Sequence, residues 1–382
     1  MPFTLALPRI AISGTHATED AVAALAQQGT RSVLLLTDEI LVKLPAAAHL
    51  RGLLAERGIA VTVFSAIEPN PTTATVEQAF AEFAAAKPDA LVALGGGSVI
   101  DTAKAVRILS ANPGPIARYE GVHPEVKPGC TLVAVATTSG TAAEVTSNAV
   151  ITDLERRVKM VIISAAIIPD IAVNDPAALA SMPAGTTAAT GMDALTHAVE
   201  AYVSRGAHPL TDHSALESIR VIAEWLPRAF DNGQDLEARE WMAHGQYLAG
   251  MAFNSAGLGC VHSLAHQPGA THNLPHGVCN AILLPVVEEF NRPAAVTRFA
   301  RVAQAMGVDT SRMTEDEASV AALDAIRALS ARVRIPAGFA QLGVKETDIE
   351  QWIAPALADP CTPGNPRTLT SEDVRALYRK AL

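Results

Sequence analysis

The sequence has few aromatic residues, few charges and few cysteines, and each shortage excludes a class of protein. Phe, Trp and Tyr make up 4% of the 382 residues, too few for the stacking platforms that bind single-stranded nucleic acid. Charged residues make up 18%, with 29 basic against 39 acidic side chains, so neither nucleic acid nor an anionic membrane is an expected partner. Hydrophobic residues make up 49%, enough for sizeable cores.

The cysteines lie far apart in the sequence, and no CxxC pair or dense spacing predicts a disulfide framework. They are Cys130, Cys260, Cys279 and Cys361. Isolated cysteines are typical of reduced thiols, and the N-terminus has no basic segment ahead of a long apolar run. Both observations favour a cytoplasmic protein.

Acidic and basic side chains are absent from a long internal stretch, residues 241–286, which nevertheless contains five histidines. A membrane-spanning helix needs about 20 mostly apolar residues. Glycines and prolines interrupt this stretch throughout. We therefore expect a buried segment that lines a site, and no membrane span.

The first half of the sequence alternates between short apolar runs and helical patterns. Continuous apolar runs at 32–37, 90–94 and 131–136 are typical of strands buried on both faces. The runs at 159–163 and 171–173 are expected to add further strands. This alternation predicts an α/β fold with a doubly wound, mostly parallel sheet and right-handed crossovers.

After about Asn174 long helical patterns replace the strands, for example over 191–203 and 210–230. No strand-like run of comparable quality follows. The sequence therefore predicts two domains, an α/β domain over 1–178 and an all-α domain over 179–382.

Three successive glycines, followed by Ser98, stand between a predicted buried strand and a predicted helix. Glycines let the backbone approach a phosphate closely, and a helix N-terminus offers free N–H groups. The loop is therefore a candidate phosphate site, although the ordinary GxGxxG fingerprint is absent. The alternative is a tight turn in which Ser98 caps the helix and Asp101 closes a capping box.

Polar residues also follow two further strands. The hydroxyl-rich segment 137–141 stands at a carboxyl end, where open α/β sheets bind ligands, or it forms an ordinary polar loop. Asp38 ends the first strong strand. Its carboxylate either binds the ribose hydroxyls of a nucleotide or caps the next helix.

Four of the eleven histidines fall within residues 262–276. Asp193 and His197 are four residues apart on a predicted helix and so share one face, and His262 and His266 repeat this spacing. His276 follows in a Pro/Gly turn. Three imidazoles and one carboxylate suit Fe(II), Zn²⁺ or a similar ion. The alternative is a polar core in which the histidines only form hydrogen bonds.

At these residues the sequence resembles the iron-containing (group III) alcohol dehydrogenase family, and in particular its small-alcohol, lactaldehyde and propanediol branch. The resemblance lies in the glycine loop with Asp101 and Lys104, and in residues 138–144, 191–197 and 257–277. It implies a dinucleotide-binding α/β domain followed by a helical domain that binds metal and substrate.

The resemblance also implies roles for individual residues. One divalent ion, Fe(II) or alternatively Zn²⁺, is expected on the family's four ligand positions, Asp193, His197, His262 and His276. The cofactor NAD is expected to contact Asp38, Asn70, Gly96, Gly97, Ser98, Thr138, Thr141 and Lys159. His266 is expected near the nicotinamide, where it would act in catalysis by relaying a proton.

The enzyme implied by the resemblance is a metal-dependent alcohol dehydrogenase that transfers hydride between a small primary alcohol or diol, or its aldehyde, and NAD(H). Its expected assembly is a homodimer or larger homo-oligomer. One alternative is a lyase resembling dehydroquinate synthase, but residues 241–286 offer no cation to hold its phosphorylated substrate. The other is a metal-free maleylacetate reductase, against which the intact ligand set argues. His272 stands where relatives often carry an aromatic residue, which bears on substrate preference.

Overall fold

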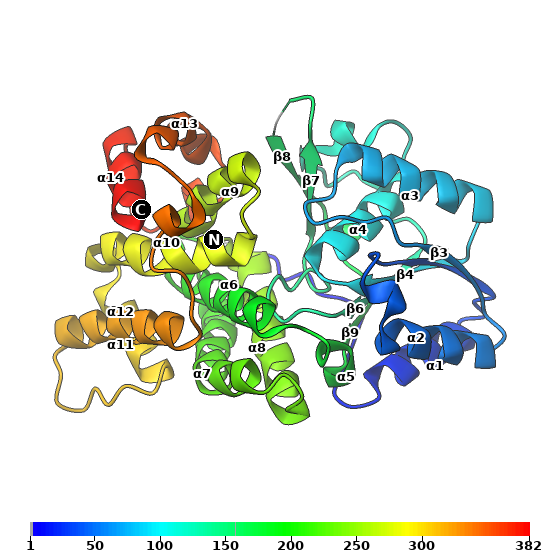
Figure 1. Cartoon of the computed structure of the whole chain (residues 1–382), viewed down its shortest axis with the longest axis horizontal. Helices are drawn as coiled ribbons and strands as arrows, with labels where there is room; N and C mark the ends of the chain where they lie inside the picture. Colours follow the sequence, from blue (N-terminus) through cyan, green and yellow to red (C-terminus); the bar gives the residue numbers. More distant parts are fainter. Residues whose placement is uncertain (1–2, 157) are drawn as a thin grey trace. The chain divides into compact units, whose positions relative to one another are not determined.

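The computed structural model describes residues 3–156 and 158–382 (Figure 1). These residues form two compact units, Ala6–Met182 and a second unit of Pro183–Leu382 with residues 3–5. All strands in the described part of the chain belong to the first unit, and the second is helical. The predicted fold class, a doubly wound parallel sheet followed by a helical domain, is confirmed. The units divide at Met182, a few residues beyond the boundary expected from the sequence.

The first unit is built on a six-stranded sheet in the order β1-β9-β6-β4-β2-β3. Every neighbouring pair is parallel. Its strands are β1 Ile10–Ser13, β2 Ser32–Leu36, β3 Ala60–Phe64, β4 Ala90–Gly95, β6 Thr131–Ala136 and β9 Ile171–Asn174. The inner strands β2, β4 and β6 are almost wholly buried, which is why they appear in the sequence as continuous apolar runs.

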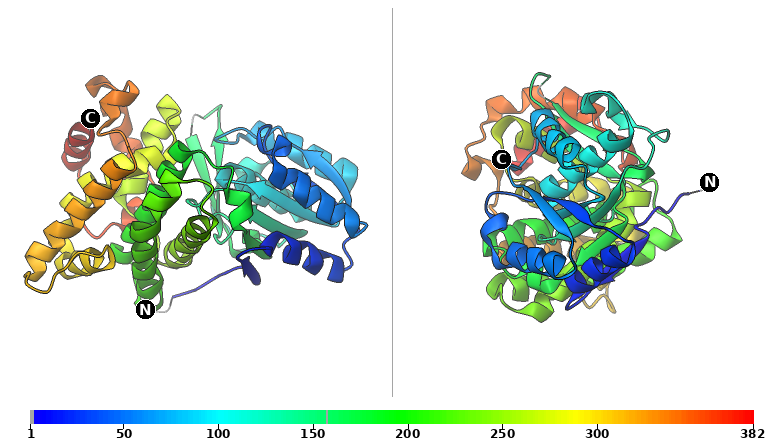
Figure 2. Two further views of the ribbon diagram at one scale, coloured as in Figure 1. Left: turned by 60° about the horizontal axis from the view of Figure 1, so that its bottom comes forward. Right: turned by 90° about the vertical axis from the view of Figure 1, so that its right-hand side faces the viewer.

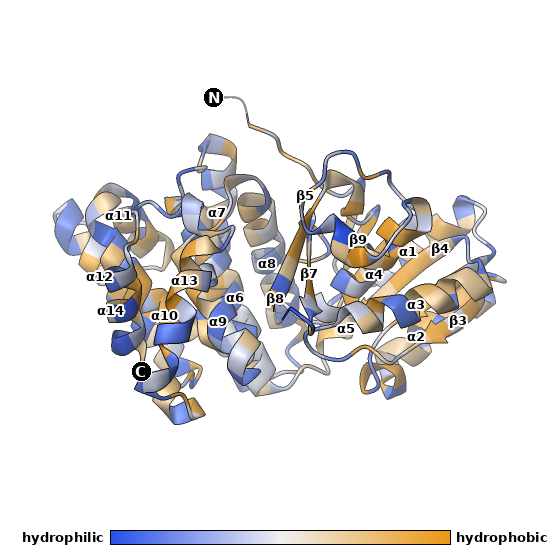
Figure 3. Cartoon of the chain, turned by 90° about the horizontal axis from the view of Figure 1, so that it is seen from above, coloured by the Kyte–Doolittle hydropathy of each residue, from blue (hydrophilic) through white to orange (hydrophobic). Residues whose placement is uncertain are grey.

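Helices cover both faces of this sheet. They are α1 Ala17–Gln27, α2 Pro45–Glu56, α3 Thr73–Ala86, α4 Gly97–Ala111 and the short α5 Pro176–Leu179, with 3₁₀ turns at η1 Leu41–Lys43, η2 Ile116–Tyr119 and η3 Ala165–Ile167. Successive side chains of β2 point to opposite faces. Val33 and Leu35 pack with α1 and α2, whereas Leu34 and Leu36 pack with α3 and α4. Figure 3 shows β4 mainly in orange, as expected for a strand enclosed by helices.

A separate three-stranded sheet lies in the same unit, in the order β5-β8-β7. Its strands are β5 Gly121–Val122, β7 Asn148–Asp153 and β8 Val158–Ile163. β7 and β8 pair antiparallel, whereas β5 and β8 pair parallel. The strand expected at 159–163 is therefore confirmed as β8, which belongs to this second sheet. β7 alternates between half-buried and buried residues, so it has no continuous apolar run from which to predict it.

The main sheet changes direction between β2 and β4. From β2 the chain continues to β3 at one edge, and it then returns to β4 on the other side of β2. In open α/β sheets ligands bind at the carboxyl ends of the strands beside such a switch point. Asp38 follows β2 and Gly96 follows β4, so predicted cofactor residues lie at this switch point.

The second unit is made of helices. They are α6 Ala184–Val203, α7 Pro209–Asp231, α8 Leu236–Ala256, α9 Cys260–His272, α10 His276–Asn291, α11 Val296–Ala305, α12 Glu315–Arg332, α13 Glu350–Ala358 and α14 Ser371–Ala381, with 3₁₀ turns at η4 Arg292–Ala294, η5 Phe339–Leu342, η6 Glu346–Asp348 and η7 Thr362–Gly364. α6, α7 and α8 pack against one another in the green part of Figures 1 and 2. Among the described residues no helix is both long and apolar enough to cross a membrane.

The uncharged stretch forms two helices whose bounds the sequence does not reveal. Pro268 lies inside α9 and Pro285 inside α10, although proline normally interrupts a helix. Asn273, in the left-handed conformation with φ 51°, ends α9, and Pro275 is the N-cap of α10. His276 is therefore the first residue of a helix, and the turn expected at this position is wrong.

Candidate metal and cofactor sites

Helix α6 presents three ionisable side chains on one face. Asp193, His197 and Glu200 follow one another at intervals of four and three residues, and all three are buried. α9 contributes the buried His262 from its first turn, and α10 contributes His276, its first residue. Three helices therefore deliver side chains to one place within the second unit.

Three of the four predicted metal ligands meet there. One ligand atom each from Asp193, His262 and His276 lies within 4.8 Å of the other two. Asp193 Oδ1 is 3.9 Å from His262 Nε2 and 3.7 Å from His276 Nε2. Because bonds from nitrogen or carboxylate oxygen to a zinc-type ion are about 2 Å long, atoms at these separations can share one ion.

The fourth predicted ligand, His197, lies beside this group but not within it. The centroid of its ring is 4.5 Å from that of His262, and the ring stacks on Phe253 at 4.3 Å. Its Nδ1 is buried and has no hydrogen-bond partner among the described residues. The structure thus places all four predicted ligands together, with His197 at the margin.

Asn280 is a member of the cluster that the sequence analysis missed. Its Nδ2 lies 2.6 Å from Asp193 Oδ1 and 3.1 Å from the Nε2 atoms of both His262 and His276. It stands one helical turn after His276 on α10, so the i, i+4 spacing was available as a signal.

The environment of the cluster favours the protonation states that bind metal, an ionised carboxylate and a neutral imidazole. Burial alone would raise the pKa of Asp193, but the nearby His197, His276 and His262 and the Asn280 hydrogen bond outweigh burial and lower the pKa below its usual value. Burial and the neighbouring His197 lower the pKa of His262 well below its usual value. At neutral pH the cluster therefore offers an ionised carboxylate and a neutral imidazole, as metal binding requires.

The Asn280 amide alone cannot donate to every acceptor that it faces in the cluster. The Asn280 amide has two hydrogens but faces three atoms, one carboxylate oxygen and two imidazole nitrogens. Asn280 Oδ1 is also buried without a partner in the described part of the chain. A divalent cation would satisfy lone pairs that one amide cannot, so these residues fit a metal ion.

His266 lies one turn after His262 and is paired with an acid that the sequence analysis did not identify. Its Nδ1 donates to Asp359 Oδ2 over 2.7 Å, and its ring stacks on that of His276 at 5.4 Å. Burial alone would raise the pKa of Asp359, but the charge and hydrogen bond of His266 and the hydrogen bonds of Cys361 lower it. With a proton on Nδ1, His266 Nε2 carries a lone pair that can accept another proton.

In the first unit the glycine loop begins α4 without any side-chain cap. Gly96 is the N-cap and has no side chain with which to cap the first turn. Asp101 accepts instead from the Val150 N–H at 3.0 Å, so the alternative in which Ser98 and Asp101 form a capping box is wrong. The first N–H groups of a helix have no partner within that helix. They are therefore oriented for an anion at this position.

Several predicted cofactor residues come together around this loop. Asn70, with φ 58°, donates its N–H to Ser98 Oγ at 3.3 Å, and its Oδ1 accepts from Lys159 Nζ at 2.8 Å. These three side chains come from a loop, a helix and a strand of the second sheet. An ammonium group is thus held close to the start of α4, where it adds positive charge for a phosphate.

The two predicted threonines lie directly against the glycines. A Cβ added at Gly96 would be 3.0 Å from Thr138 Cγ2, and one added at Gly97 would be 3.0 Å from Thr141 Cγ2. Side chains at these glycines would crowd the threonines, so the hydroxyl-rich segment and the glycine loop form one surface.

Asp38 caps the turn that leads into η1, although it is not the N-cap of a helix, since Ile40 is the N-cap of η1 and Leu44 that of α2. Its Oδ1 accepts from the N–H groups of Ile40 and Leu41 at 2.9 and 2.7 Å. Capping uses one carboxylate oxygen, and a second remains on this half-buried side chain. A ribose contact through Oδ2 is therefore compatible with the cap.

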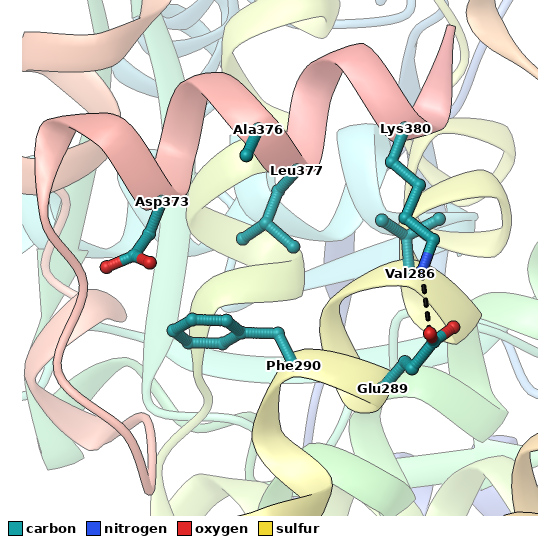
Figure 4. A pocket seen from close by; sticks show the side chains of 7 residues that line it. All are labelled: Val286, Glu289, Phe290, Asp373, Ala376, Leu377 and Lys380. Carbon is teal, nitrogen blue, oxygen red and sulfur yellow. Dashed lines mark ion pairs between the residues drawn. The ribbon is translucent and has the colours of Figure 1, made fainter.

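A hollow of about 220 Å³ lies elsewhere in the second unit, between α10 and α14 (Figure 4). Phe290 and Leu377 line it, and the ion pair of Glu289 with Lys380, 2.7 Å long, closes one side. It lies toward the end of α10, since Glu289 and Phe290 are about 20 Å along the helix from His276 at 1.5 Å per residue. None of the predicted site residues lines it.

A glycine loop at the switch point of a doubly wound sheet and a carboxylate–imidazole cluster in a helical unit are the features of a nucleotide-dependent metalloenzyme. Two family models match the chain, iron-containing alcohol dehydrogenase over residues 8–176 and the C-terminal model of the Fe-containing alcohol dehydrogenase family over 187–382. The chain belongs to the iron-containing alcohol dehydrogenase family.

Individual relatives agree with this assignment. The chain is 42% identical over 376 residues to an NAD-dependent methanol dehydrogenase of Bacillus methanolicus, covering 98% of this chain and 99% of the relative. It is 42% identical over 357 residues to a lactaldehyde reductase of Escherichia coli K12, covering 93% of each. A crystal structure of 1,3-propanediol oxidoreductase superposes with a TM-score of 0.98 at 40% identity, over the whole of both chains.

These matches confirm the family and the reaction class predicted from the sequence. The protein is an oxidoreductase of the NAD-dependent alcohol dehydrogenase type, and the matches support this reading over the lyase and the maleylacetate reductase. Glu200, Asn280 and Asp359 remain the polar partners that the sequence analysis did not identify.

Proposed function

We propose that this protein interconverts a small primary alcohol or diol and its aldehyde, with NAD(H) as the hydride carrier and Fe(II) as the metal. The ion would be held by Asp193, His197, His262 and His276, with Zn²⁺ as the alternative occupant. The observation that carries the proposal is the convergence of Asp193, His262 and His276 on one point, with a neutral imidazole and an ionised carboxylate. Ligands of this kind suit Fe(II) and Zn²⁺.

Different residues of the chain are proposed to bind the metal, accept the proton and bind the cofactor. Asp193, His197, His262 and His276 would hold a divalent ion, which would supply a Lewis acid for the alcohol oxygen. His266 accepts the hydroxyl proton at Nε2, because Asp359 holds its Nδ1 proton in place at 2.7 Å. The glycine loop, with Ser98, Asn70 and Lys159, binds the pyrophosphate of NAD, and Thr138 and Thr141 line the same surface.

Exposed apolar residues near the second sheet concern the assembly of the protein, and its cysteine thiols concern its location. Val122 and Leu154 are 71% and 65% exposed on or beside that sheet, and we propose that another copy of the chain covers them. All four cysteines are free thiols, which suits a reducing compartment. A cytoplasmic homodimer or larger homo-oligomer is therefore part of the proposal.

The proposed function is tested by following NADH absorbance while the anaerobically purified, Fe(II)-loaded protein is given NAD and a panel of short primary alcohols and diols. Net accumulation of NADH, lost after chelation and restored by Fe(II), is the expected result. Loss in air would further favour Fe(II) over Zn²⁺. No NADH with any alcohol, together with no oxidation of NADH by the matching aldehydes, would refute the proposal.

Asp38 is expected to make the enzyme prefer NAD to NADP. A carboxylate near the adenosine ribose accepts from the free hydroxyls and repels a 2′-phosphate. Like charges about 4 Å apart near a protein surface repel by about 1–4 kcal/mol, so Asp38→Gly should shift the NADP/NAD ratio of kcat/KM toward NADP by about tenfold or more. Asp38→Asn is the matched control, because it removes the charge while keeping the size. If neither variant changes the ratio, Asp38 serves only as the cap.

A further inference from the structure

We propose that Glu200 is a positioning residue that holds His262 in the tautomer able to bind metal, with the proton on Nδ1 and the lone pair of Nε2 directed to Asp193 and His276. The proposal deepens the proposed function, since it rests on the same metal site. It starts from the contact between Glu200 Oε2 and His262 Nδ1. Metal binding by His262 Nε2 does not by itself require this contact.

Both oxygens of the Glu200 carboxylate are engaged at the start of α9. Oε2 contacts His262 Nδ1, and Oε1 accepts from the Val261 N–H at 2.7 Å. The side chain is 1% exposed, so water does not compete for these bonds. The positive end of the α9 dipole further favours a carboxylate in this position. Glu200 thus caps the helix and contacts the imidazole in its first turn.

The backbone around this carboxylate is shaped to admit it. A Cβ added at Gly259 would lie 3.1 Å from Glu200 Oε1 and 2.8 Å from Asn365 Oδ1. Asn365 Oδ1 in turn accepts from the Cys260 N–H at 3.1 Å. Glycine before the helix therefore gives two buried acceptors access to consecutive N–H groups.

The proton on His262 follows from these contacts. Burial raises the pKa of Glu200 to about 7, so at mildly alkaline pH its side chain is a carboxylate. A carboxylate only accepts hydrogen bonds, so the nitrogen that faces it carries the hydrogen. A neutral imidazole has one N–H, so a proton on Nδ1 leaves Nε2 without one. Nε2 is then an acceptor, consistent with its 3.1 Å contact to the Asn280 amide nitrogen. Carboxylates that orient metal-binding histidines in this way commonly change metal affinity 10–100-fold when they are replaced.

The helix that carries Glu200 also carries two of the proposed ligands. Asp193, His197 and Glu200 lie on one face of α6, so a single helix sets two ligands directly and a third through its contact with α9. The position of α6 therefore bears on three of the four proposed ligands, and α10 supplies the fourth.

Glu200→Gln tests this role because an amide cannot make both contacts. If its oxygen accepts from Val261, its NH₂ group faces Nδ1 and moves the imidazole proton to Nε2, the metal-binding atom. We expect Zn²⁺ to bind the metal-free variant about 10–100-fold more weakly than wild type in competition with a coloured chelator. At mildly alkaline pH, ¹⁵N NMR of labelled histidines should show His262 protonated on Nδ1 in metal-free wild type and on Nε2 in the variant.

Two further variants keep the test decisive. Glu200→Ala removes the contact entirely, and it too should weaken Zn²⁺ binding. Glu288→Gln is the matched control, because Glu288 is equally buried and accepts from Asn291 Nδ2 at 3.0 Å, while burial and the nearby Glu200 raise its pKa to about 8. The amide of Glu288→Gln resembles the neutral, protonated form of Glu288, so we expect this variant to bind Zn²⁺ with the affinity of wild type. Circular dichroism and NAD binding confirm that each variant is folded.

The inference is overturned if His262 carries its proton on Nε2 in wild type, or if both Glu200 variants bind Zn²⁺ as tightly as wild type. Failure of the proposed function gives a different result, in which wild type and Asp193→Ala bind Zn²⁺ equally or not at all. Even then the tautomer of His262 in the metal-free protein decides whether Glu200 holds it.

Discussion

Asp193→Ala is expected to yield a protein without its divalent ion and without alcohol dehydrogenase activity. Asp193 is the anionic member of the three residues whose ligand atoms converge, and it is 1% exposed. Without Asp193 only neutral imidazoles remain as ligands, and none of them carries a negative charge to balance the divalent cation. Replacing a residue that merely orients a ligand costs about 10–100-fold in metal affinity, so losing the carboxylate should cost more than about 100-fold.

The measurement is metal content per chain after anaerobic purification, in parallel with the rate of NADH formation. Asp193→Asn serves as the control, since it preserves the size of the side chain and removes the charge. Wild type and Asp193→Ala holding equal amounts of metal would show that Asp193 is not a ligand. Full activity without any bound ion would show that the histidines only form hydrogen bonds in a polar core.

His266→Ala is expected to lower turnover by about 10²–10⁴-fold, the usual contribution of a general acid–base, while the bound metal persists. His266 stacks on His276 but is not one of the converging ligands, and its Nδ1 is held by Asp359. Loss of Nε2 removes the group that accepts the proton, whereas the metal keeps its own ligands. Steady-state kinetics and metal analysis on the same preparation separate the two effects.

His244→Ala is the matched control for this substitution. His244 lies on α8 with its ring 5.6 Å from that of Trp241, and no role in the site is assigned to it. Its replacement should leave turnover close to that of wild type. Unchanged turnover in His266→Ala would show that His266 only packs, and loss of metal in that variant would instead make it a ligand.

The strands predictable from the sequence are those enclosed on both faces. β2, β4 and β6 are covered by helices on either side, so nearly every side chain must be apolar. β1, at the sheet edge, alternates between half-buried and exposed residues and has no such run. α9 and α10 carry prolines and lie in a segment without charges, so they show little of the polar and apolar alternation that reveals a surface helix.

The site was predictable where its pattern is local. The four-residue spacing of Asp193 and His197 and of His262 and His266 follows from helix geometry alone. The partners of these residues were not predictable, because tertiary packing brings them together. Glu200 meets His262 across 62 residues, and Asp359 meets His266 across 93. Spacing in the sequence identifies which side chains lie on the same face of a helix. Only the packed structure shows which residues of other helices contact that face.

Because the proposed ligands lie on three helices, α6, α9 and α10, the stability of the folded chain should depend on the concentration of the metal ion. Residues so far apart in the sequence come together only in the folded chain, so an ion that needs them all binds the native state and not the unfolded one. Such selective binding adds about 2.7 kcal/mol to stability when the free ion is at 100 times its dissociation constant. A cell short of the ion would therefore hold less of this enzyme as well as a less active one, since unfolded chains are degraded.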